Sequence, residues 1–129
     1  MNGMDVMKFS LREVPLVVQE IMESAGWKDE DGVIYAMHQP NRLILEYLVH
    51  LIKPADEGRL PIVLTKTGNT GAASIPLLLS VDHERLESSY SLKKVILCGF
   101  GVGFSWGAVA ADLSMTHIFP PRISEGVPE

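Results

Sequence analysis

The sequence predicts an α/β domain with three layers, in which helices cover both faces of a mixed five-stranded sheet. Apolar runs of strand length alternate with stretches of helical periodicity, which gives the element order βαβαβαββ. The strand-helix crossovers imply parallel strands, whereas a Gly-rich turn late in the chain joins the last two strands as a hairpin. With 129 residues, 47% of them hydrophobic, the chain has enough apolar side chains for one domain core.

The first strand is predicted at residues 4–11, where apolar and polar residues alternate loosely. A helix follows, because the next apolar residues recur at the spacing of one helical face. We expect Ser10 to cap this helix together with Glu13, and Gly26 to end it. Residues 28–31 are then a charged loop.

Residues 33–37 are a short apolar run and predict the second strand. Pro40 is expected to open the second helix, since its missing N–H needs no partner at the first helical position, and Pro54 ends it. A third strand is predicted at residues 60–65, with Pro61 near its start. The inward face of the second helix is expected to hold Ile44, Tyr47, Leu48, Leu51 and Ile52.

The small residues at 68–74 lead into a third helix, which runs through the apolar residues 75–79 to a polar end. The fourth strand is predicted at residues 94–100 and the fifth at residues 104–111. Both faces of the fifth strand carry apolar or small residues, so we expect it to be buried. The tail from Thr116 is rich in proline and is expected to be irregular.

Composition limits the classes of function. The net charge is −5 and the basic residues do not cluster, so phosphate contacts to nucleic acid are not expected. No apolar run reaches the roughly 20 residues that span a bilayer, and no signal peptide is visible, so we expect a soluble cytoplasmic protein. Residues 68–81 and 95–113 are almost free of charge, and a domain of this size cannot bury them all. Some apolar surface is therefore expected to need a partner.

His38 is the first candidate site residue, because it follows the second strand and precedes a helix. Functional groups in α/β folds gather at the carboxyl ends of parallel strands. The positive end of the next helix disfavours the imidazolium, so a neutral imidazole that donates a hydrogen bond is plausible. A partly buried histidine bonded to backbone is an equal alternative.

Asn69 holds an equivalent place after the third predicted strand, between Gly68 and Gly71. Its alternative is an ordinary turn or helix-capping asparagine. The run Gly99–Gly103 lacks the third glycine of a dinucleotide-binding loop, since Trp106 stands there and a strand follows. Backbone N–H groups of such a hairpin can form an oxyanion hole, and a simple tight turn is the alternative.

The remaining candidates predict little chemistry. Cys98 lies within a strand, without a basic neighbour in sequence, so we expect it to be a small buried hydrophobe. One cysteine excludes an intramolecular disulfide. The other histidines, His50, His83 and His117, lack the spacing of metal ligands, and no metal site is expected.

Three segments taken together carry a family resemblance: His38–Asn41, Thr67–Pro76 and Gly99–Ala108. In this order and spacing they resemble the C-terminal half of β-ketoacyl-acyl-carrier-protein synthase III, a condensing enzyme of the thiolase fold. The opening residues Met1–Val6 also resemble the start of that half. The resemblance assigns residues 1–115 to this domain and 116–129 to a tail outside it.

The resemblance implies a carbon–carbon bond-forming reaction that uses acyl-CoA and a malonyl group on acyl carrier protein as substrates, without a cofactor. It implies that His38 and Asn69 hydrogen-bond the malonyl thioester carbonyl and stabilise the enolate. The backbone N–H of Val102 is implied as an oxyanion donor in acyl transfer. The implied substrate-binding positions are Gln39, Asn41, Gly101 and Gly103.

The chain also departs from the family. The nucleophilic cysteine of the family lies in the N-terminal half, which this chain does not contain, so the chain alone is predicted to be inactive. Val102 stands where the family has glycine, and Pro40 replaces a usual alanine. Leu43 takes the place of an arginine that docks the carrier protein in many members, and Arg42 precedes it.

The expected partners are acyl-CoA, acyl carrier protein, the missing N-terminal half and a second copy of the chain. Self-association is expected through the helix at residues 71–79, whose small residues are buried between the halves in the family. The alternative function is a non-catalytic module of the same fold that binds acyl carrier protein or a synthase partner.

Overall fold

The computed structural model describes residues 2–28, 31–122 and 124, so the expected loop at 28–31 and the tail lie partly outside the described residues. Two short 3-10 turns, η2 (Glu57–Arg59) and η3 (Gly71–Ala73), connect the longer elements. The helices and strands are α1 (Gly3–Ala25), β1 (Ile34–Met37), α2 (Arg42–Ile52), α3 (Leu64–Thr67), α4 (Ser74–Ser89), β2 (Val95–Gly101) and β3 (Ser105–Ala111).

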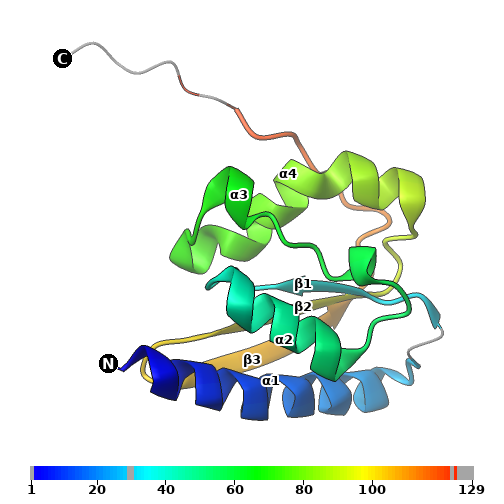
Figure 1. Ribbon diagram of the computed structural model, residues 1–129. Coiled ribbons are helices and arrows are strands. Elements are labelled where there is room, and N and C mark those ends of the chain that lie inside the picture. The colour runs from blue at the N-terminus through cyan, green and yellow to red at the C-terminus, as the bar shows by residue number, and fades with distance from the viewer. Residues whose placement is uncertain (1, 29–30, 123, 125–129) are drawn as a thin grey trace.

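The sheet is mixed, as predicted, but its described part has three strands rather than five, in the order β1-β2-β3 (Figure 1). β1 is parallel to β2, and Met37 is paired with Cys98 at the carboxyl end of β1. β2 and β3 form the expected antiparallel hairpin. Gly103 and Phe104 have positive φ angles of 75° and 37°, and they turn the chain between the two strands.

The predicted first strand at residues 4–11 is wrong, because α1 runs through the whole segment. The side chain of Asn2 caps this helix and accepts a hydrogen bond from Met4 N at 3.0 Å. Ser10 is therefore inside the helix rather than its cap, and its hydroxyl donates to Val6 O. The predicted end is confirmed, since Gly26 adopts a left-handed conformation with φ 69°.

The second helix begins later than predicted. Asn41 is its N-cap and accepts a hydrogen bond from Ile44 N at 2.9 Å, which leaves Pro40 outside the helix. Ile44 and Leu48 face the core as expected, but Tyr47 and Leu51 are nearly half exposed. The apolar stripe of α2 is thus wider than the surface that the fold covers.

The predicted third strand at residues 60–65 is also wrong. Residues 60–63 have no regular secondary structure, and α3 begins at Leu64. Leu60 and Val63 are nevertheless buried. Pro61 has no N–H to offer to a strand ladder, so its missing donor is consistent with an irregular segment.

Helices cover both faces of the sheet, as predicted (Figure 1). On one face, α1 and α2 enclose a core cluster that includes Val14, Val18, Tyr35, Leu48 and Ile96. On the other face, α4 packs against Ile34, Ala36 and Val95 through Leu78 and Leu86. No helix in the described part of the chain is long and apolar enough to cross a membrane.

The expectation that the last strand is buried on both faces is wrong for β3. Phe9 of α1 contacts Phe104 and Trp106, with ring centroids 4.7 and 5.1 Å apart, yet the side chain of Trp106 remains 46% exposed. On the opposite face Val109 is 56% exposed. β3 is thus a strand at the edge of the described sheet.

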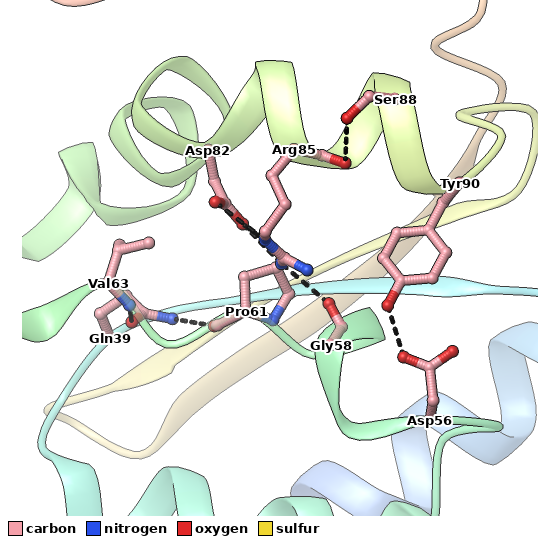
Figure 2. A network of polar contacts seen from close by, with 9 residues as sticks. All are labelled: Gln39, Asp56, Gly58, Pro61, Val63, Asp82, Arg85, Ser88 and Tyr90. Atoms are coloured by element: carbon pink, nitrogen blue, oxygen red, sulfur yellow. Dashed lines mark hydrogen bonds and ion pairs between the residues drawn. The ribbon is translucent and has the colours of Figure 1, made fainter.

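Polar contacts tie the segment around η2 to α4 (Figure 2). Arg85 forms an ion pair with Asp82 at 2.7 Å and donates a hydrogen bond to Gly58 O at 2.9 Å. The hydroxyl of Tyr90 donates to the carboxylate of Asp56 at 2.5 Å. These bonds hold residues 56–58 beside the C-terminal half of α4.

Candidate active site

His38 lies directly after β1, at the carboxyl end of the strand where the sequence places it. Its backbone N–H donates to Cys98 O at 2.9 Å and so extends the β1–β2 ladder by one bond. Its ring packs edge-on against Phe100, with centroids 5.4 Å apart and an interplanar angle of 84°. The backbone and the ring are thus both held by β2.

The side chain of His38 reaches the start of α4. Its Nδ1 lies 2.9 Å from Ser74 Oγ, and the Ser74 hydroxyl donates to Gly71 O at 2.7 Å. Ser74 is one of three buried polar residues in the described part of the chain. Sequence reasoning missed Ser74, because the small residues around it indicate close packing and give no sign of a polar contact with His38.

A cavity of about 270 Å³ brings the end of β1, the start of α4 and the β2–β3 hairpin together. His38 and Val102, predicted from separate motifs, both line this cavity, and so does Gly101. The complete lining consists of His38, Gly71, Ala72, Ile75, Gly99, Phe100, Gly101 and Val102. Most of these residues are small or apolar. His38 is the only one of them with a titratable side chain.

Burial lowers the pKa of His38 below its ordinary value of 6.5, and the nearby backbone of Gly71 opposes this shift. The neutral imidazole expected from the sequence is therefore the favoured form near neutral pH. Burial of the ring is the main cause of this shift.

Asn69 holds the loop that faces His38. Its Oδ1 accepts a hydrogen bond from Gly71 N at 3.0 Å, and its Nδ2 donates to Pro40 O at 3.3 Å. Asn69 thus joins the segment before α4 to the segment after β1. Its side chain does not line the 270 Å³ cavity, and the turn geometry matches the alternative considered for it from the sequence.

Gln39 and Asn41 are occupied by backbone groups. Gln39 is fully buried, its Nε2 donates to Met37 O and Pro61 O at 3.1 Å each, and its Oε1 accepts from Val63 N at 2.9 Å (Figure 2). Asn41 caps α2. In this structure both residues shape the loop that carries His38, and the substrate-binding roles implied for them stay predictions.

The hairpin exposes Val102, with 76% of its surface accessible. Gly101 ends β2 and is paired with Ser105, whereas Gly103 forms the turn with φ 75° and lies outside the cavity lining. A side chain at Gly103 would be strained in this conformation. The Val102 backbone is thus presented at the rim of the cavity by a turn that requires glycine next to it.

Cys98 is buried in the core, as predicted, and burial raises the pKa of its thiol from 9.0 to about 12. A thiol in this state is a poor nucleophile. Within residues 2–28, 31–122 and 124, no three His, Cys, Asp or Glu side chains form a group that could hold a metal ion.

A larger cavity of about 590 Å³ lies between α2, the η2 segment and α4. Arg42 and Arg85 line it, but they pair with Glu46 and Asp82 on their own helices. Its charged groups are largely balanced, and none of the candidate residues from the sequence lies in it. The smaller cavity at His38 is therefore the better candidate site.

Comparison with known proteins identifies the chain's relatives. The family described as 3-oxoacyl-[acyl-carrier-protein (ACP)] synthase III C terminal matches residues 22–113. The chain is 34% identical over 113 residues to the β-ketoacyl-[acyl-carrier-protein] synthase III of Gloeobacter violaceus, covering 86% of this chain and 33% of that protein. It is 37% identical over 118 residues to the enzyme of the same name from Acholeplasma laidlawii, covering 88% of this chain and 35% of that protein.

Solved structures give the same result. The 3-oxoacyl-(acyl-carrier protein) synthase from Burkholderia xenovorans superposes with a TM-score of 0.78 and 28% identity, over 94% of this chain and 35% of that one. The thiolase-like α/β architecture is thus confirmed. The chain spans about a third of the length of the relatives it matches. It belongs to the 3-oxoacyl-acyl-carrier-protein synthase III family and corresponds to the C-terminal part of those enzymes.

Proposed function

We propose that this chain contributes the C-terminal part of the site of a 3-oxoacyl-ACP synthase III, which condenses an acyl-CoA primer with malonyl-ACP in fatty-acid or related biosynthesis. The observation that carries the proposal is the cavity that His38 shares with the Gly99–Val102 end of the hairpin. In a member of this family, these are the groups through which the C-terminal part would act.

The proposed reaction has two stages. A cysteine supplied by the rest of the enzyme attacks the thioester of acyl-CoA, and the coenzyme A thiol leaves with a proton. The malonyl carboxylate then departs as carbon dioxide, and its bonding electrons form an enolate whose negative charge lies on the thioester oxygen. The enolate carbon attacks the acyl group, the new carbon–carbon bond forms, and the cysteine thiolate is released.

The roles of the residues follow from where negative charge develops. His38 and Asn69 are proposed to hydrogen-bond the malonyl thioester oxygen as it becomes an enolate. The N–H of Val102 is proposed to bind the oxyanion formed when the acyl group is transferred. Gln39, Asn41, Gly101 and Gly103 are proposed to act by fixing the two loops that present these groups.

The chain alone is not expected to turn over substrate. Cys98 is its only cysteine, and it is buried within β2 with its pKa raised to about 12. The acyl-enzyme must therefore form on a cysteine of another polypeptide segment. We propose that this segment corresponds to the N-terminal two thirds of the relatives, and that a second copy of the complete assembly completes a dimer.

Reconstitution tests the proposed function. The full chain is mixed with the separately expressed N-terminal two thirds of the Gloeobacter violaceus enzyme, and malonyl-ACP decarboxylation and acyl condensation are measured. Both activities are expected only in the mixture. His38→Ala should lower decarboxylation by at least about 100-fold, the loss typical of removing an oxyanion donor. His50→Ala, a change on the exposed face of α2, is the matched control and should leave the rate unchanged.

Two outcomes contradict the proposal. If the mixture forms a complex that decarboxylates malonyl-ACP equally well with His38→Ala, His38 has no role in charge stabilisation. If the chain binds acyl carrier protein with the same affinity whether or not the N-terminal segment is present, and the mixture stays inactive, the non-catalytic binding module is the better description.

A further inference from the structure

The Ser74 hydroxyl lies between two polar groups at the start of α4. Its Oγ is 2.9 Å from His38 Nδ1 and 2.7 Å from Gly71 O. A hydroxyl has a single hydrogen to donate, and it can accept through its lone pairs. The side chain is 3% exposed, so water does not compete for either contact. The direction of both bonds therefore depends on where this one hydrogen points.

The Gly71 carbonyl fixes that direction. A carbonyl oxygen can only accept, so two oxygens 2.7 Å apart are held together only if the Ser74 hydrogen lies between them. The Ser74 oxygen then faces His38 with a lone pair. A contact of 2.9 Å between that lone pair and a ring nitrogen is favourable only when the nitrogen carries a proton.

We propose that Ser74 is a positioning residue that fixes neutral His38 in the tautomer with its proton on Nδ1, which leaves Nε2 unprotonated. The contact with Ser74 is made by Nδ1 and not by Nε2. The neutral ring can therefore accept a proton or a hydrogen bond at Nε2. It can donate from Nε2 only after the ring has taken up a second proton.

This inference rests on the proposed function only for its catalytic consequence. A hydrogen bond from His38 Nε2 to a thioester oxygen would require the imidazolium form. No other titratable side chain lines the cavity, so the second proton must come from the solvent or from the substrate complex. Ser74 would thus decide whether His38 enters the site as a proton acceptor or as a donor.

Nitrogen-15 NMR of the histidine rings tests the tautomer without any turnover. The full chain carries an internal standard, because His83 Nδ1 lies 2.9 Å from the backbone carbonyl of Ser80, which can only accept. Neutral His83 must therefore also carry its proton on Nδ1. At a pH where the rings are neutral, the two ring nitrogens of His38 should give the same pattern as those of His83, with the His38 signals assigned by His38→Gln.

Three variants separate the role of Ser74 from a general effect on the fold. Ser74→Ala should move the His38 pattern toward the tautomer with its proton on Nε2, and Ser74→Thr should restore the wild-type pattern by returning a hydroxyl. Ser10→Ala is the matched control, since Ser10 is also buried and also donates to a backbone carbonyl at 2.7 Å, but on α1. It should leave the His38 pattern unchanged.

The inference is overturned if wild-type His38 carries its proton on Nε2, or if Ser74→Ala leaves the pattern as it is. If Ser74→Ala does not fold, the wild-type spectrum and Ser74→Thr still decide. A wild-type Nε2–H pattern in a protein that is active after reconstitution would remove the role of Ser74 and keep the proposed function. The expected Nδ1–H pattern in a protein that stays inactive after reconstitution would keep the role of Ser74 and remove the proposed function.

Discussion

β1 and β3 flank the same central strand, and both are made of apolar and small residues, yet their surroundings differ completely. All four residues of β1 are buried, with α1 and α2 over one face and α4 over the other. No residue of β3 is fully buried. Apolar composition therefore shows that a strand can be buried. Whether it is buried depends on which other elements pack against it.

The two outer strands also differ in how the chain beside them is held. The Gln39 side chain, just after β1, bonds the backbone at Pro61 and Val63 (Figure 2). The segment that leads to Pro61 is held by Arg85, which bonds Gly58 O, and by Tyr90, which bonds Asp56. Beside β3 the described residues provide ring contacts from Phe9 on one face. This contrast can be tested by changes placed on each side of the sheet.

The largest expected effect is on thiol reactivity. Cys98 lies in the central strand between β1 and β3, and burial raises the pKa of its thiol from 9.0 to about 12. A shift of this size lowers the thiolate fraction at pH 8 by roughly a thousandfold. Alkylation by iodoacetamide should therefore be very slow in the folded chain and normal in urea.

A second cysteine sharpens this test. Val109→Cys in a Cys98→Ala background places a thiol on exposed β3, and it should react at the rate of a free peptide thiol. Burial raises the pKa of the Cys98 thiol in the folded chain. The contribution of this thiol to the free energy of unfolding is therefore complete below pH 9, and it is lost as the pH rises from about 9 to about 12. Rapid alkylation of native Cys98 would contradict the burial of the central strand.

The next largest effect is on stability. Ile34→Ala in β1 should lower the free energy of unfolding by about 2–5 kcal/mol, because the fully buried side chain leaves a cavity. Val109→Ala in β3 should change it by less than about 0.5 kcal/mol, since that side chain is 56% exposed. Urea denaturation measures both. Equal losses would mean that another segment or chain covers β3 in solution.

A smaller loss is expected at Gln39. Gln39→Met keeps the size of the side chain but removes three hydrogen bonds to buried backbone, which should lower the free energy of unfolding by about 1–3 kcal/mol. Gln19→Met on the exposed surface of α1 is the control and should be nearly neutral. If the two variants are equally stable, the Gln39 amide does not hold residues 61–63.

A loss smaller than that at Gln39 is expected at Tyr90. Tyr90→Phe removes the hydroxyl that donates to Asp56 and keeps the ring, which lies 4.4 Å from the guanidinium carbon of Arg59. The bond is exposed to solvent, so the free energy of unfolding should fall by about 1 kcal/mol or less. A loss as large as that of Ile34→Ala would mean that this network, rather than the core, holds the segment in place.

The sequence could predict those elements whose pattern is local. The strand at residues 34–37 follows from a short apolar run, and the helix after residue 74 follows from an apolar stretch with a polar end. The segment at residues 4–11 misleads because loose alternation is compatible with a strand, while Phe9, Ser10 and Val14 also share a buried helical face. The Asn2 cap decides between the two by starting the helix early.

The site could be predicted only in part. His38 follows from the rule that strand ends carry function, whereas Val102 follows from the Gly-rich hairpin and the family resemblance. The structure brings both to one cavity. The contact between His38 and Ser74 joins residues 36 positions apart, and no local pattern indicates it. The irregular segment at residues 60–63 also depends on a contact far along the chain, since the Gln39 amide bonds Pro61 O and Val63 N.

Gln39 and Asn69 both carry a carboxamide, and the number of hydrogens on each nitrogen separates what they can do. Both hydrogens of the Gln39 nitrogen are engaged, one by Met37 O and one by Pro61 O. Asn69 uses one for Pro40 O, and the described residues engage no other. In the role proposed for Asn69, this second hydrogen would bind the substrate oxygen while the first keeps the two loops together. Gln39 has no N–H hydrogen left for such a role.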